Sequence, residues 1–156
     1  MRGHSGAWCG YVGIGATHPL YDTDSSDVAP WDDRWMERAV DIDEVGAINL
    51  FISAFEASRN EIPHGHAPLT SILTCHGGLS FSGRLRTWTG WFFGFDCSHA
   101  GDYSPVMAQA LQEAGIECDF MHDFETYRNQ AYVRNECENL AWQLAQYAAA
   151  CTFKGA

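Results

Sequence analysis

The sequence predicts an α+β fold in which helices cover one face of a small, mainly antiparallel β-sheet. Short aromatic and β-branched runs, near the N-terminus and between residues 74 and 96, have the composition of strands. Other segments carry apolar residues three and four positions apart, which is the period of an amphipathic helix. The two patterns together predict both kinds of element in one chain.

Length and charge limit the classes of protein to consider. The chain has 156 residues, 46% of them hydrophobic, so it can bury one sizeable core, and we expect a single globular domain over residues 1–156. The net charge of −11 argues against direct binding to nucleic acid or to an anionic membrane, because both need a cationic surface. No run approaches the roughly 18 apolar residues of a membrane span, and MRGHSGAW lacks the apolar core of a signal peptide. A cytoplasmic protein is expected.

The N-terminal part should begin with a strand. The run AWCGYVGI is aromatic and β-branched and ends in a turn around GATHPLYD. The acidic run YDTDSSDVAPWDD, residues 21–33, should be a surface loop. Segment 35–60 is expected to be a helix because its apolar residues recur at spacings of three and four, at Val45, Ile48, Ile52 and Phe55.

Two further helices are expected in the C-terminal third. In the first, Ser104 can cap the N-terminus, Pro105 fits the first helical position and Gly115 suits the left-handed residue past the end. The second covers residues 127–151 and should dock against the sheet through one stripe, formed by Val133, Cys137, Leu140, Leu144 and Cys151.

The six cysteines are expected to be free thiols, because none stands in a CxxC pair and the expected compartment is reducing. Three of them, Cys75, Cys137 and Cys151, fall on faces that we assign to the core. Buried cysteine behaves there as a small hydrophobic residue.

Residues 74–96 are expected to form a hairpin centred on Leu85. This register assigns one face to the core, with Cys75, Leu79, Phe81, Trp91, Phe93 and Phe95, and makes Gly77 the partner of Phe93. The opposite face is small and polar, and it places His76 opposite Gly94 and diagonal to Asp96. Gly78 and Gly94 would then form the floor of a ligand pocket. The alternative is that His76 and Asp96 are a structural hydrogen-bonded pair.

Polar residues just past the second strand add candidate metal ligands. Asp96, His99 and Asp102 follow one another there, and His76 adds a second imidazole. This mixed nitrogen and oxygen set suits zinc, manganese or iron(II). We assign His76, His99 and Asp96 to the metal, and Asp96 or Asp102 to proton transfer from the bound water.

Two alternatives to a metal site use a thiol nucleophile. Cys9, His76 and Asp96 occur in the order of papain-like enzymes, but the sequence after Cys9 is a poor helix and cannot lower its pKa in the way those enzymes do. Cys97 is the other candidate, and its neighbour Asp96 would raise rather than lower the thiol pKa.

Five segments, AWCGYVG, THPLY, HGGLSFSG, WFFGFDCSHAGD and YRNQAYVRNECENLA, together resemble a family of small hypothetical proteins from tailed bacteriophages and some actinobacterial genomes. The resemblance implies a phage accessory protein in the host cytoplasm and assigns no activity to any residue.

The residues themselves favour a metal-assisted hydrolase of a small phosphorylated or amide substrate, with Arg128 meeting a phosphate. The alternative is a noncatalytic anti-defence protein, which sequesters a small nucleotide-like signal or uses its acidic residues 21–44 against a basic host protein.

Overall fold

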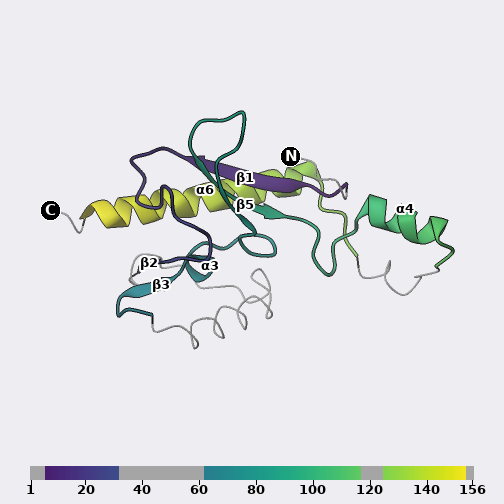
Figure 1. The fold of residues 1–156 in the computed structure, drawn as a ribbon, viewed down its shortest axis with the longest axis horizontal. Coiled ribbons are helices and arrows are strands. Elements are labelled where there is room, and N and C mark those ends of the chain that lie inside the picture. Colours follow the sequence, from purple (N-terminus) through teal and green to yellow (C-terminus); the bar gives the residue numbers. More distant parts are fainter. Residues whose placement is uncertain (1–5, 32–61, 117–124, 154–156) are drawn as a thin grey trace.

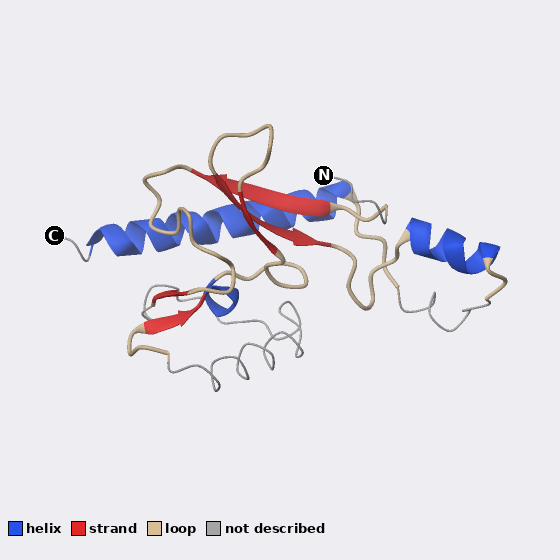
Figure 2. Cartoon of the chain, viewed as in Figure 1, coloured by secondary structure: helices blue, strands red, loops and turns tan. Residues whose placement is uncertain are grey.

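The computed structural model describes residues 6–31, 62–116 and 125–153, and it confirms the α+β class (Figures 1 and 2). The described elements are, in order, β1 (Cys9–Ile14), β2 (Val28–Pro30), β3 (His66–Pro68), α3 (Leu69–Ile72), β4 (Phe81–Gly83), β5 (Trp91–Asp96), α4 (Pro105–Glu113) and α6 (Gln130–Phe153). The helix predicted over residues 35–60 lies outside the described residues.

The main sheet has three antiparallel strands in the order β1-β5-β4, so β5 is the central strand. A second antiparallel sheet consists of β2 and β3. Successive side chains of β5 point to opposite faces, and Phe93 and Phe95 are 0% and 1% exposed on the face that turns toward α6. This face of β5 is the core face, as the sequence predicted.

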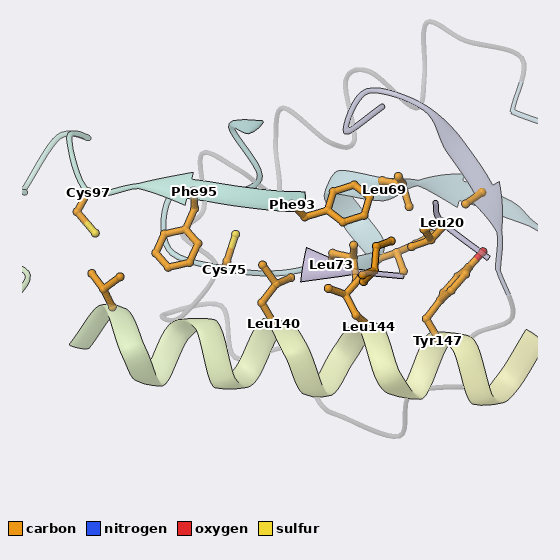
Figure 3. Packing of buried hydrophobic residues seen from close by; sticks show 14 residues of the cluster. Leu20, Leu69, Leu73, Cys75, Phe93, Phe95, Cys97, Leu140, Leu144 and Tyr147 are labelled. Carbon is orange, nitrogen blue, oxygen red and sulfur yellow. The ribbon is translucent and has the colours of Figure 1, made fainter. Parts of the chain in front are cut away.

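The long helix α6 supplies the other side of the core (Figure 3). It packs against β1, and its Leu140, Leu144 and Tyr147 side chains project into the core. Each of these residues is at most 2% exposed, which stabilises the fold by about 1.5–3 kcal/mol for a fully buried large apolar side chain. The Tyr147 hydroxyl donates a hydrogen bond of 3.0 Å to the Pro30 carbonyl, so its polar end is satisfied. The predicted apolar stripe of this helix is confirmed.

The predicted register of the hairpin was wrong. It paired Phe81 with Thr89, whereas Phe81 pairs with Gly94, five residues further along. Because five is an odd number, Phe81 lies on the opposite face from the one predicted. The first predicted strand is also much shorter, because β4 begins only at Phe81 and His76 lies in a turn before it.

The register explains Gly94 differently from the sequence prediction. Its two cross-strand partners are Tyr11 and Phe81, whose rings meet edge to face with centroids 5.4 Å apart. A Cβ at Gly94 would lie 2.6 Å from the Tyr11 ring and 2.9 Å from the Gly10 carbonyl oxygen. Gly94 therefore makes room for an aromatic pair, where we had predicted the floor of a pocket beside His76.

The predicted capping of α4 is confirmed. The Ser104 hydroxyl accepts a hydrogen bond from Met107 N, Pro105 occupies the first turn, and Gly115 has a φ of +69° just past the end. None of the residues of α4 is buried, and Figure 2 shows this helix standing apart from the sheet.

The chain departs toward α4 and returns from it at one place. Tyr103 N donates to the Thr126 carbonyl at 3.0 Å, and Thr126 N donates to the Gly101 carbonyl at 2.8 Å. These bonds form a short parallel bridge between Asp102 and Thr126. The start of α6 is thereby held next to the loop that follows β5.

Candidate metal centre

His76 lies in a tight turn between α3 and β4. Gly78 N donates to the Cys75 carbonyl at 2.9 Å, and Gly77, at the third position of the turn, has a φ of +67° that favours glycine. A Cβ at Gly77 would also collide with the imidazole of His99. Gly77 therefore makes room for His99, where the sequence prediction assigned it to a core phenylalanine.

Side chains of α6 fix the position of this turn. The buried Gln143 amide accepts from Thr74 N at 2.7 Å and donates to the Thr74 carbonyl at 2.8 Å. The Glu136 carboxylate accepts from His76 N at 2.9 Å, and the Tyr132 hydroxyl lies 3.0 Å from His76 Nδ1. Both the backbone and the ring of His76 are thus held by the helix.

The loop after β5 brings in a second imidazole and a carboxylate. Asp102 N donates to the His99 carbonyl at 3.0 Å, and His99 N donates to Asp102 Oδ2 at 3.1 Å, so the loop closes on itself. Asp96 is engaged elsewhere, because its two oxygens accept from the Ser80 hydroxyl at 2.9 Å and from Ser98 N at 3.1 Å.

Three side chains converge on the carboxylate of Asp102, whose side chain is 2% exposed. His76 Nε2 lies 2.7 Å from Oδ2, and His99 Nδ1 lies 3.7 Å from the same oxygen. Arg128 Nε donates to Oδ1 at 3.0 Å, and its guanidinium lies 4.8 Å from the centre of the Tyr132 ring. The potential ligand atoms of His76, His99 and Asp102 all lie within 4.8 Å of one another. The group can hold a metal ion.

One nitrogen of this group has no hydrogen-bond partner. His99 Nδ1 is buried and unsatisfied within the part of the chain that the structure describes. A buried polar atom without a partner costs about 1–3 kcal/mol. The other side of the ring is open, because the His99 side chain is 37% exposed. An unsatisfied nitrogen that faces a buried carboxylate is suited to a cation.

The protonation states of Asp102 and Tyr132 are compatible with binding a cation at this group. Burial alone would raise the pKa of Asp102, but hydrogen bonds from His76, Arg128 and His99 outweigh burial and lower that pKa below its ordinary value. The carboxylate is therefore charged at neutral pH, as a metal ligand must be. Burial, with a contribution from Glu136, raises the pKa of Tyr132, so its hydroxyl keeps its proton.

The thiol alternatives receive little support from the geometry. Burial, together with the carboxylates of Asp102 and Asp96, raises the pKa of Cys97 to about 12, so its thiolate is scarce at neutral pH. Cys9 lies opposite Asp96 across β1 and β5, but His76 is bonded to Asp102 instead of Asp96.

The structure brings together four of the side chains predicted for the site, namely His76, His99, Asp102 and Arg128. Gly78 closes the turn that carries His76, but Gly94 lies under the aromatic pair of the sheet. Asp96, which we predicted as a metal ligand, lies outside the group of potential ligands, and Asp102 takes its place. Their catalytic and binding roles stay predictions.

Sequence reasoning missed two members of the site, Tyr132 and Glu136. They follow Arg128 at intervals of four residues; Tyr132 and Glu136 lie on one line of α6 beside the apolar stripe, and Arg128 stands just before the helix begins. Asn129 Oδ1 accepts from Tyr132 N at 2.9 Å and so caps α6 directly after Arg128. This spacing was a usable signal in the sequence.

No model of a protein family matches the chain, and no curated protein or solved structure is significantly similar to it. The resemblance to phage proteins therefore stays a prediction. Within the described residues, no helix has the length and apolar character needed to cross a membrane. Most of the acidic segment 21–44 lies outside the described residues.

Proposed function

We propose that this protein is a metal-dependent hydrolase of small phosphorylated substrates, with His76, His99 and Asp102 as the ligands of a divalent cation. The observation that carries the proposal is the buried His99 Nδ1, which lacks a partner and faces the carboxylate oxygen that His76 also approaches. Two imidazoles and one carboxylate suit zinc, manganese or iron(II).

The two separations measured from Asp102 are compatible with one shared ion. Zinc bonds of about 2.0–2.1 Å in a tetrahedral site place neighbouring ligand atoms about 3.3 Å apart. The separations from Asp102 Oδ2 are 2.7 Å to His76 Nε2 and 3.7 Å to His99 Nδ1, one shorter and one longer than this value. Shifts of about half an ångström, within the reach of side-chain rotation, would equalise them.

The partners of the ligands support the same reading. Metal-binding histidines usually engage their second ring nitrogen in a hydrogen bond that fixes the tautomer. The Tyr132 hydroxyl is placed for this at His76 Nδ1, and Arg128 Nε occupies the carboxylate oxygen of Asp102 that faces away from the histidines. The proposed ligands are thus oriented before any ion binds.

The exposed side of the group favours catalysis over a purely structural metal. Catalytic sites keep a coordination position for water, and His99 and Arg128 are 37% and 30% exposed. Water bound to a metal has a pKa of about 7, so the reaction does not depend on a strong carboxylate base. The Arg128 guanidinium beside the group suits a phosphate.

Metal binding is tested first on protein stripped with a chelator. Stoichiometry is measured by elemental analysis and affinity by calorimetry after adding zinc, manganese or, without oxygen, iron(II). We expect one ion per chain, and at least a roughly 100-fold loss of affinity in His99→Ala, which removes a ligand that makes no internal bond through Nδ1. His64→Ala, in an exposed loop, is the matched control and should bind like the wild type.

Hydrolysis is tested with p-nitrophenyl phosphate on the loaded protein. We expect turnover that His99→Ala abolishes and that Arg128→Lys weakens mainly through a higher KM, because lysine lacks the planar fork. Equal ion content in wild type and His99→Ala would overturn the metal site, leaving a structural hydrogen-bond network. Full ion content without turnover of phosphate esters would overturn the hydrolase and leave a binding protein.

A further inference from the structure

A cavity of about 530 Å³ lies apart from the metal centre, between β1, α6 and the loop that joins β4 to β5. This loop, teal in Figure 1, projects from the sheet. None of the residues that line the cavity belongs to the group around Asp102. Its volume is within the range of about 300–1,000 Å³ that is usual for sites of small molecules.

Aromatic side chains dominate the walls, and they are Trp8, Tyr11, Trp88 and Phe92. Trp8 is held by a hydrogen bond of 3.1 Å from its Nε1 to the Tyr127 hydroxyl, and Tyr11 is held by its edge-to-face contact with Phe81. Two walls are therefore formed in advance, which lowers the entropy lost on binding.

Trp88 is the exposed member of the wall. It is 69% exposed, the largest value among the exposed large hydrophobic residues of the described chain. A single exposed tryptophan needs no explanation by itself, but this one stands at a cavity that other rings already line. A planar ring bound there would cover it and stack in an offset or edge-on arrangement.

The charge of the lining is unlike that of the chain. The sequence carries 20 acidic residues and a net charge of −11, yet none of the described lining residues is acidic. The charged lining residue is Arg134 of α6, for which no ion pair with a described residue is present. An anionic group that enters the cavity therefore meets a cation without a competing carboxylate in the lining.

We propose that this cavity binds a small planar aromatic molecule that carries one anionic group. The ring lies among Trp8, Tyr11, Trp88 and Phe92, and the anion pairs with Arg134. The site is independent of the proposed metal, so His76→Ala leaves its affinity unchanged.

The test uses two dyes that share one aromatic skeleton and differ in an anionic group, on the folded full chain. The anionic probe is 8-anilino-1-naphthalenesulfonate, the neutral one is N-phenyl-1-naphthylamine, and binding is followed by fluorescence titration. Trp88→Ala weakens both dyes roughly tenfold through lost stacking. Arg134→Gln weakens the sulfonate roughly tenfold and the neutral dye less than about twofold. Trp142→Ala and Arg86→Gln, exposed residues outside the lining, are the matched controls.

Protection of a cysteine thiol from alkylation is a second, independent measure of binding in this cavity. Cys9 lines the cavity and Cys151 does not. Saturating sulfonate dye slows alkylation of Cys9 by iodoacetamide and leaves the rate at Cys151 unchanged, as measured by peptide mass spectrometry. The proposal is overturned if binding does not saturate at one dye per chain. It is also overturned if Trp142→Ala weakens binding as much as Trp88→Ala, if Arg86→Gln weakens it as much as Arg134→Gln, or if both thiols are protected equally.

Discussion

The Asp102→Asn substitution tests how strongly the site depends on a buried charge. The carboxylate accepts hydrogen bonds from His76, from Arg128 and from the backbone of His99. An asparagine cannot satisfy these donors. With its NH₂ in place of Oδ1 it faces Arg128 Nε–H, and with its NH₂ in place of Oδ2 it faces His99 N–H. One donor therefore opposes another in either orientation of the amide.

The size of the expected loss of stability follows from the burial and the three hydrogen bonds of this carboxylate. Breaking a buried, hydrogen-bonded charge group costs about 3–5 kcal/mol. For a chain of this length, that corresponds to a fall in Tm of roughly 6–20 °C, measured by circular dichroism on chelator-treated protein. Asp96→Asn is the matched control, because Asp96 is less buried and makes two hydrogen bonds, and we expect a loss of at most about 1 kcal/mol.

The loss of stability caused by Asp102→Asn should depend on pH. The folded-state pKa of Asp102 lies below its unfolded value, so its charge adds stability above pH ~4 and loses that contribution as the pH falls through the folded pKa. The difference between wild type and Asp102→Asn should be full at pH 6 and should shrink below pH ~4. A constant difference, or a Tm equal to that of Asp96→Asn, would refute the reasoning.

Three further substitutions test the fold and the turn. Gly94→Val should lower stability by at least about 1–3 kcal/mol in urea unfolding, because its side chain would collide with Tyr11; an unchanged midpoint would contradict the observed register. Phe93→Ala should lower the free energy of unfolding by about 3–5 kcal/mol in the same assay, because it loses buried surface and leaves a cavity. An almost unchanged stability would show that Phe93 is not a core residue. Gly77→Ala should displace the His99 ring and abolish metal binding in calorimetry, and wild-type affinity would show that the turn does not position that ring.

Much of the fold could be predicted because local patterns decide it. The alternation of β5 placed Phe93 and Phe95 in the core, and the helical period placed Leu140 and Leu144 against them. Both patterns depend on neighbours within one element. The register between β4 and β5 depends on where the connection begins, and no turn signal in residues 84–90 fixed that position.

The candidate site could be predicted only in part for a similar reason. His99 and Asp102 were found because polar residues gather just past the end of β5, whereas His76 was selected through a hairpin register that the structure does not have. The choice between Asp96 and Asp102 depended on the direction of each carboxylate in the loop after β5, which hydrogen bonds with Ser80, Ser98 and the loop backbone decide. Such bonds join distant or irregular segments, and periodicity carries no information about them.

The segment between Asp102 and Thr126, which contains α4, is joined at its two ends by backbone hydrogen bonds, and this affects how insertions and deletions in it act on the rest of the fold. The backbone bonds of Tyr103 and Thr126 fix the place where the chain leaves and the place where it returns. Insertions and deletions are tolerated where the backbone on both sides keeps its own bonds. A shorter or longer segment in place of α4 should therefore leave the side chains around Asp102 in their positions.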